Sequence, residues 1–187
     1  MQETKLTLSN IAGFCPEPAV WQLVADLCDI VQAHRSGAYL APDNIIADHY
    51  SFRVDDTGVE AQEFQAPETA ATGQVTDAQC VWSMGALIYY CTLGRVVFGG
   101  HGSAYQRQHP DVALPVLPKT HRALTPVLHR CLCTDPAQRI GLQELRALAH
   151  EKLGQLSTDR PRREPAPQHN DKKQPSCHQK SWPEEMT

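Results

Sequence analysis

Residues 64–94 read FQAPETAATGQVTDAQCVWSMGALIYYCTLG, and the rest of the chain is organised around this stretch. Its apolar run, residues 81–93, places apolar side chains at i, i+3, i+6, i+7 and i+10 counted from Val81, which is helical spacing. The other side of the run is apolar as well. A helix that is apolar all round is buried on every side, so the run predicts a central helix. Asp77 is its candidate N-cap, and Gly94 is its predicted C-terminal stop.

Five further segments carry helix or strand patterns. Residues 19–36 place apolar side chains on one face, after a proline and before a glycine, which predicts an amphipathic helix. Residues 51–54 alternate in character and predict a short strand. Helices are also predicted at residues 103–108, at 125–132 with a start as early as 122, and at 140–153. The predicted fold class is therefore mainly α.

Composition limits the class of protein. A chain of 187 residues with 41% apolar content suffices for one domain with one core. A formal charge of −4 implies no general affinity for nucleic acid, and no apolar run reaches the roughly 18 residues that a membrane span needs. The start is polar and lacks a signal core, and the seven cysteines fall mostly in apolar helical patterns. We therefore expect buried thiols in a reducing, cytoplasmic setting.

The chain divides into three parts. Residues 1–19 are expected to pack as a short segment on the helical domain, which spans residues 20–154. Residues 155–187 hold five prolines, mixed charges and few large apolar side chains, which predicts a disordered tail. This tail carries six Lys or Arg against five Asp or Glu, so residues 1–154 hold a net charge of −5.

Four motifs follow one another along the chain: APE at residues 66–68, VWSMG at 81–85, GRVVFG at 94–99 and CLCTDPAQR at 131–139. In this order and spacing they resemble the A-P-E, D-V-W-S-x-G, T-G-x-x-P-F and C-L-x-x-D-P-x-x-R motifs in the C-terminal lobe of protein kinases. The resemblance covers about residues 20–153. It implies the helical fold of that lobe without its β-rich N-terminal partner lobe.

The same resemblance assigns structural roles to five residues. In kinases the glutamate of the first motif and the arginine of the last form a buried ion pair, so we expect Glu68 to pair with Arg139. Breaking one partner of a buried pair typically costs about 3–5 kcal/mol. Pro67, Trp82 and Gly85 occupy the other structural positions of these motifs.

The catalytic parts of a kinase are not matched. Residues 40–48, LAPDNIIAD, resemble the L-K-P-E-N-I-L-L-D part of the catalytic loop. In kinases an H-R-D motif precedes this part, and its aspartate acts as the catalytic base. That motif aligns here with residues 34–36 or with residues 37–39, and neither alignment supplies an aspartate. Ala41 replaces the lysine that contacts the transferred phosphate, and Cys80 replaces the aspartate that opens the central helix. The N-terminal segment holds neither a glycine-rich loop nor a strand lysine. No catalytic residue is predicted.

Two positions resemble the magnesium ligands of kinases. Asn44 and Asp56 match them, but both also lie in ordinary turn sequences, so we predict only vestigial metal positions and no bound cofactor. His129, Cys131 and Cys133 suggest zinc as an alternative. Their spacing is not C-x-x-C and no second pair exists, so no metal site is predicted.

The opening of the chain resembles that of the kinase non-catalytic C-lobe (KIND) domains, which occur in actin-nucleating Spir proteins and in a large non-receptor tyrosine phosphatase. An L-x-L-x-x-hydrophobic segment at residues 6–11 and a helix start with Trp21 carry this likeness. It implies a pseudokinase-like scaffold that binds a protein or peptide partner on the surface that an N-lobe covers. An acidic body suits a basic, helical partner.

Two alternatives stay open at this point. One is a degenerate serine/threonine kinase-like protein that binds Mg-ATP, with Asp43 or Asp56 as the replacement carboxylate. The other is a fold relic with no binding role.

Overall fold

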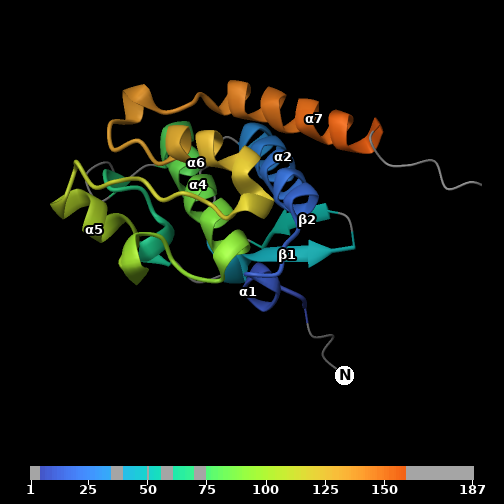
Figure 1. Cartoon of the computed structure of the whole chain (residues 1–187), viewed down its shortest axis with the longest axis horizontal. Coiled ribbons are helices and arrows are strands. Elements are labelled where there is room, and N and C mark those ends of the chain that lie inside the picture. The colour runs from blue at the N-terminus through green and yellow to red at the C-terminus, as the bar shows by residue number, and fades with distance from the viewer. Residues whose placement is uncertain (1–4, 35–39, 50, 56–60, 70–74, 159–187) are drawn as a thin grey trace, which may run out of the picture.

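The computed structural model describes residues 5–34, 40–49, 51–55, 61–69 and 75–158, and this part of the chain is mainly helical, as predicted (Figure 1). The helices are α1 (Leu8–Ile11), α2 (Glu17–His34), α4 (Asp77–Leu93), α5 (Gly102–Gln108), α6 (Thr125–Cys131) and α7 (Leu142–Thr158). The strands β1 (Ile45–Asp48) and β2 (Ser51–Val54) form a two-stranded antiparallel sheet. Short 3₁₀ turns are η1 (Pro42–Asn44), η2 (Gln62–Phe64), η3 (Phe98–Gly100), η4 (Lys119–Leu124) and η5 (Pro136–Gln138).

Helix α4 is the central element, as its sequence predicts. Thirteen of its 17 residues are buried, so it presents no broad face to solvent. It packs against α2, α6 and α7 (Figure 1). Gly85 allows the closest of these contacts, because a Cβ at this position would lie 2.7 Å from the Cβ of Cys131 on α6. A glycine is therefore required where α4 and α6 cross.

The two ends of α4 are set by local chemistry. The N-cap is Thr76, so the prediction of Asp77 is wrong by one residue; Asp77 is the first residue of the helix. Thr76 is extended and its hydroxyl accepts from the Gln79 N–H, while the Gln79 side chain accepts from the Thr76 N–H at 2.7 Å. This reciprocal capping box selects Thr76 over its neighbour. Gly94 ends the helix in the left-handed conformation, as predicted.

Helices α2 and α7 lie side by side, and both pack against α4 (Figure 1). Helix α2 begins at Glu17, two residues earlier than predicted, and the Glu17 carboxylate accepts from the buried Trp21 indole at 3.1 Å. Helix α7 runs to Thr158, so residues 155–158 of the predicted tail are helical. Local bonds continue the helix there, since the Ser157 hydroxyl donates to the Leu153 carbonyl at 2.8 Å. Residues 159–187 lie outside the described part of the chain.

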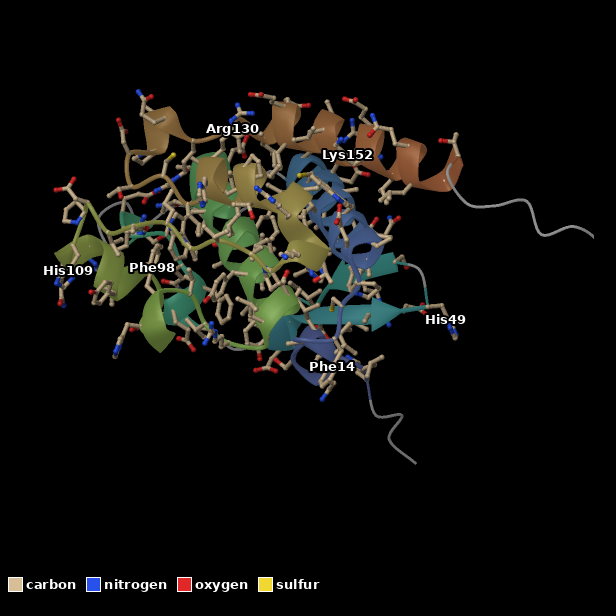
Figure 2. The ribbon with its side chains drawn as sticks, in the orientation of Figure 1. Phe14, His49, Phe98, His109, Arg130 and Lys152 are labelled. Atoms are coloured by element: carbon tan, nitrogen blue, oxygen red, sulfur yellow. The ribbon has the colours of Figure 1, made fainter. Side chains whose placement is uncertain are left out.

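Buried hydrogen bonds join α4, α5 and α6. The Trp82 indole donates to the Gln106 side chain at 2.8 Å, and the Gln106 amide donates to the Leu132 carbonyl at 2.6 Å. Helix α6 starts at Thr125. The prediction allowed a start as early as residue 122, but residues 119–124 form the 3₁₀ turn η4 directly before the helix. On the surface of this region, Arg130 pairs with Glu144 of α7 at 2.7 Å (Figure 2).

The N-terminal segment lies against the sheet and α4. Leu8 is fully buried, and the Leu6 carbonyl accepts from the Ala47 N–H of β1 at 2.8 Å. The Gly13 N–H donates to the Cys91 carbonyl of α4 at 2.8 Å. Phe14, by contrast, is 87% exposed and projects from the body (Figure 2). None of the described helices has the length and apolar character to span a membrane.

Candidate functional site

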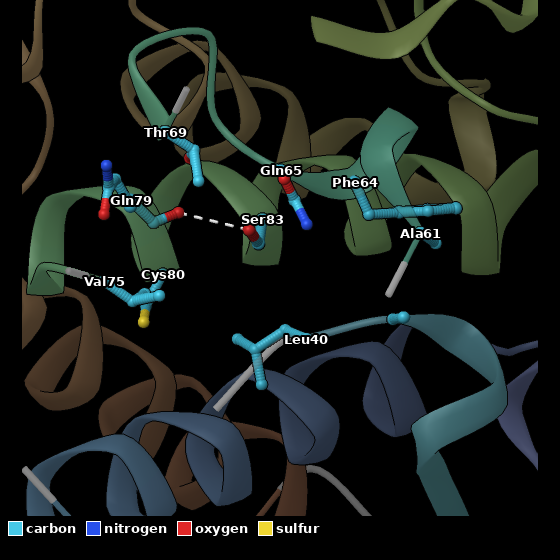
Figure 3. Close-up of a pocket in the computed structure, with 10 residues that line it drawn as sticks. Leu40, Ala61, Phe64, Gln65, Thr69, Val75, Gln79, Cys80 and Ser83 are labelled. Carbon is cyan, nitrogen blue, oxygen red and sulfur yellow. Dashed lines mark hydrogen bonds between the residues drawn. The ribbon is translucent and has the colours of Figure 1, made fainter. Parts of the chain in front are cut away.

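A pocket opens between the segment ahead of η1 and the first half of α4 (Figure 3). Its cavity volume is about 20 Å³, room for about one water molecule and far below the range for small-ligand sites. The described lining residues come from three stretches of chain: Leu40, Ala41, Ala61, Phe64, Gln65, Thr69, Val75, Gln79, Cys80 and Ser83.

Turn η2 forms one side of the pocket and is held by α4 and α5. The Phe64 ring packs edge-on against Tyr90 of α4, with centroids 5.3 Å apart. The Ser103 hydroxyl of α5 donates to the Gln62 carbonyl at 3.4 Å. Gly102 approaches the turn so closely that a Cβ there would lie 2.1 Å from the Glu63 oxygen. These contacts make the η2 side of the pocket a fixed wall.

Two polar side chains, Gln65 and Thr69, also lie on this side of the pocket. The Gln65 Nε2 and the Thr69 Oγ1 are buried and have no hydrogen-bond partner among the residues that the structure describes. Both side chains lie on the side of the pocket opposite Leu40 (Figure 3). The Ser83 hydroxyl is different, because it donates to the Gln79 carbonyl of its own helix at 3.2 Å.

Cys80 lines the pocket on the α4 side. Burial, with a smaller effect of the Asp77 charge, raises the pKa of its thiol to about 12. The thiol is therefore neutral at physiological pH and is neither a nucleophile nor a proton acceptor there.

The expected ion pair between Glu68 and Arg139 is present at the edge of this region. The two guanidinium NH₂ groups of Arg139 donate to the two oxygens of the Glu68 carboxylate, one of them at 2.8 Å. The Arg139 side chain is 1% exposed and that of Glu68 is 24% exposed. Pro67 beside it is buried. The pair joins the stretch before α4 to the stretch after α6.

Arg139 also makes three bonds that the sequence did not predict. Its guanidinium donates to the carbonyls of Cys133 at 2.8 Å, Ala78 at 3.0 Å and Thr134 at 3.2 Å. All five donors of this side chain are thereby used, and its role is to hold three chain segments together.

Of the two predicted metal positions, the structure describes only Asn44. Asn44 is buried in η1, its backbone carbonyl accepts from the Asp55 N–H at 2.7 Å, and it does not line the pocket. Asp56 lies outside the described residues, and its neighbour Asp55 pairs with Lys5 at 2.7 Å. Asp43 is exposed.

No cluster of three or more metal-ligating side chains occurs in the part of the chain that the structure describes. Of the residues considered for zinc, Cys131 is fully buried, and the His129 ring hydrogen-bonds to the Pro115 carbonyl at 2.9 Å. The Cys133 thiol donates to the His129 carbonyl at 3.4 Å.

Gln65 and Thr69 are the site residues that sequence reasoning missed. They flank the APE motif, but a glutamine and a threonine in a turn-rich stretch carry no pattern that distinguishes them. A scan against protein-family models and a search of curated proteins find no match to this chain. The kinase-like and KIND-like resemblances therefore stay predictions.

Proposed function

We propose that this protein is a catalytically inactive, kinase-C-lobe-like module that binds a peptide segment or domain of a protein partner. The observation that carries the proposal is the chemistry of the pocket wall. Among the described residues, the ten that line the pocket include no carboxylate, ammonium, guanidinium or imidazole group. Phosphoryl transfer needs a group that positions or accepts the hydroxyl proton and cations on the developing charge, and this wall supplies neither.

The residues that match kinase motifs support a scaffold. Glu68 and Arg139 bond to each other and to backbone, Trp82 anchors α5, and Gly85 allows α6 to approach α4. Each stabilises the fold and none faces the pocket. Ala41 and Cys80 do face it, and these are the two positions where the resemblance expects a catalytic lysine and a loop-anchoring aspartate.

The partner that we propose docks on the side of the domain that holds the pocket, which corresponds to the surface that an N-lobe covers in a kinase. The net charge of −5 on residues 1–154 favours a basic, helical partner through long-range attraction. We propose the cytoplasm as the compartment, because the six cysteines of the described residues are free thiols, which a reducing environment maintains.

Thermal unfolding of the full chain with Mg-ATP tests the absence of nucleotide binding. A ligand at a hundred times its Kd adds about 2.7 kcal/mol, or roughly 5–11 °C for a chain of this size. We expect no shift with magnesium alone or with Mg-ATP. A rise of several degrees that the Asp56→Ala substitution removes would establish a nucleotide binder instead, and a melt without cooperativity would favour a fold relic.

Peptide display against the full chain tests the binding role. Selected peptides should bind the Ala113→Trp control, which changes an exposed loop residue, as well as the unmodified chain. They should lose affinity for the Ala61→Trp variant, whose indole fills the pocket. Equal binding to the Ala61→Trp variant would place the interaction elsewhere, and failure to select any peptide would count against the module.

A further inference from the structure

Two cysteines from distant parts of the chain meet beside the last turn of α4. The Gly13 N–H donates to the Cys91 carbonyl at 2.8 Å, and a Cβ on Gly13 would lie 3.3 Å from the Gly94 Cα. These contacts hold the segment before α2 against α4, and Cys15 follows two residues later. The Cys15 thiol donates to the Ile11 carbonyl at 3.4 Å, and its sulfur accepts from the Cys91 thiol. Because the two sulfurs are in hydrogen-bond contact, they can join with little movement of the backbone.

The hydrogen bond makes the two thiols chemically unequal. Donation from Cys91 lowers the pKa of the Cys15 thiol and outweighs burial, which acts to raise it. The same bond, together with burial, raises the pKa of Cys91 well above its ordinary value. Because the thiolate is the nucleophilic form, Cys15 is the sulfur that attacks an oxidant, and Cys91 is the neighbour that can complete a disulfide.

The other buried cysteines of the described residues lack this combination. Burial raises the pKa of Cys28 and of Cys80 to about 12, and the Cys28 thiol donates to the Met84 sulfur at 3.7 Å. Burial raises the pKa of Cys131 as well. These three thiols are therefore neutral at physiological pH and react slowly with oxidants.

Cys15 is also the more accessible member of the pair. It is 6% exposed, whereas Cys91 is fully buried, and its neighbours Phe14 and Pro16 are both exposed. Phe14 marks this part of the surface (Figure 2). Hydrogen peroxide is small and uncharged, and it has to cross only the outermost layer of side chains to reach the Cys15 sulfur. A bulkier alkylating reagent such as iodoacetamide is excluded from the same sulfur in the native chain.

We propose that Cys15 and Cys91 are a redox-sensitive pair, in which hydrogen peroxide oxidises Cys15 and Cys91 then closes a disulfide between the N-terminal segment and α4. Disulfides of this kind, formed transiently in response to an oxidant, are the ones that occur in a reducing compartment. The inference goes beyond the proposed binding function and does not depend on it.

The chemistry of the pair balances in two steps. The Cys15 sulfur attacks one peroxide oxygen, the O–O bond breaks, and a sulfenic acid on Cys15 and one water form. The Cys91 sulfur then attacks the Cys15 sulfur, the S–O bond breaks, and the hydroxyl leaves as a second water with the Cys91 proton. The two thiols supply two electrons and two protons, and the peroxide is reduced to two waters.

Peroxide treatment of the full chain, followed by mass spectrometry without reduction, tests the pair. A background with Cys133→Ser and Cys177→Ser removes the half-buried thiol and the thiol outside the described residues, so that neither joins two molecules. The intact mass should fall by about 2 Da, the two hydrogens lost on disulfide formation, and a digest should contain one peptide pair joined through Cys15 and Cys91. Dithiothreitol should restore the mass and separate the peptides.

Single substitutions in this background separate the roles of the two sulfurs. In the Cys91→Ala variant Cys15 should gain oxygen as a sulfenic or sulfinic acid, because no neighbouring thiol displaces it. In the Cys15→Ser variant Cys91 should stay unmodified over the same time. Cys28→Ala is the matched control, since it removes a buried thiol outside the pair and should leave the crosslink unchanged. A cooperative thermal melt shows that each variant is folded before it is oxidised.

Three results would overturn the inference. The first is no loss of mass in the folded chain under conditions that oxidise the half-buried Cys133 of the unsubstituted chain. The second is a mixture of crosslinks in which other buried cysteines take part as often as the pair. The third is oxidation of Cys91 in the Cys15→Ser variant as fast as in the parent. The peptide-display experiment reads out none of these, so this inference and the proposed binding function fail separately.

Discussion

Replacement of Glu68 by glutamine should destabilise this protein strongly, although the two side chains have nearly the same shape. The substitution keeps one acceptor oxygen but removes the charge that compensates Arg139, whose side chain is 1% exposed. It also turns an NH₂ group toward the guanidinium. Loss of one partner of a buried pair costs about 3–5 kcal/mol. The 24% exposure of Glu68 admits some water, so we expect a value near the lower limit, about 3 kcal/mol, or a midpoint about 6–12 °C lower.

The Arg139→Met substitution should cost more, about 4–5 kcal/mol. It leaves the carboxylate without its partner and also leaves the carbonyls of Ala78, Cys133 and Thr134 without a donor. Because both substitutions break the same pair, the double variant should be destabilised by less than the sum, with a coupling of up to about 3 kcal/mol.

Urea unfolding followed by far-ultraviolet circular dichroism gives the free energies of unfolding for this cycle. Glu144→Gln is the matched control, since the Glu144–Arg130 pair has a similar length, 2.7 Å, but side chains 58% and 47% exposed. It should change stability by no more than about 1 kcal/mol. A cost below about 1 kcal/mol for Glu68→Gln, or additive single substitutions, would refute the reasoning that this pair is buried and structural.

Three further perturbations test other parts of the fold. Gly85→Ala should lower the free energy of unfolding by about 1–3 kcal/mol in thermal melts, because the added Cβ would clash with α6. Gly154→Ala is the control: no atom lies within 4 Å of the added Cβ, so this substitution should raise the free energy of unfolding by up to about 1 kcal/mol. Equal effects of the two substitutions would contradict the close packing at Gly85. Burial acts to raise the pKa of Asp29, but the hydrogen bond and charge of Arg146 and the neighbouring His150 outweigh it, so this pKa lies below its ordinary 3.8. The stability that Asp29 contributes is therefore full above pH 3.8 and is lost as the pH falls through the lower folded-state pKa. The thermal unfolding midpoint of an Asp29→Asn variant should fall less steeply than that of the unmodified chain between about pH 4 and 2. Parallel curves of midpoint against pH for the two proteins would argue against the shift. In a Cys177→Ser background, iodoacetamide at about pH 8 should modify only the half-buried Cys133 of the native chain. Cys80, whose pKa is about 12, should react only after unfolding. Early modification of Cys80, detected by mass spectrometry, would contradict its burial.

Patterns that are local in the chain could be predicted from the sequence. The apolar run of α4 and its terminal glycine predict the helix and its end, because helical spacing and left-handed geometry depend on neighbouring residues only. The N-cap prediction failed by one residue since Thr76 and Asp77 are both good caps, and the reciprocal bond with Gln79 decides between them. The predicted tail began too early, at residue 155, because the amino-acid composition of the chain changes there although helix α7 continues to Thr158.

What the sequence alone determined is the mainly helical class, the buried central helix and, through motif resemblance, the partnership of Glu68 with Arg139. Only the tertiary structure decided that Leu40, Gln65 and Cys80 line one pocket, and that the Gln65 amide lies buried there without an acceptor among the described residues. The physical reason is that a hydrogen bond or a pocket wall depends on which distant segments meet. Periodicity reports on the turns of one helix and carries no information about the partner that a buried polar atom finds across the fold.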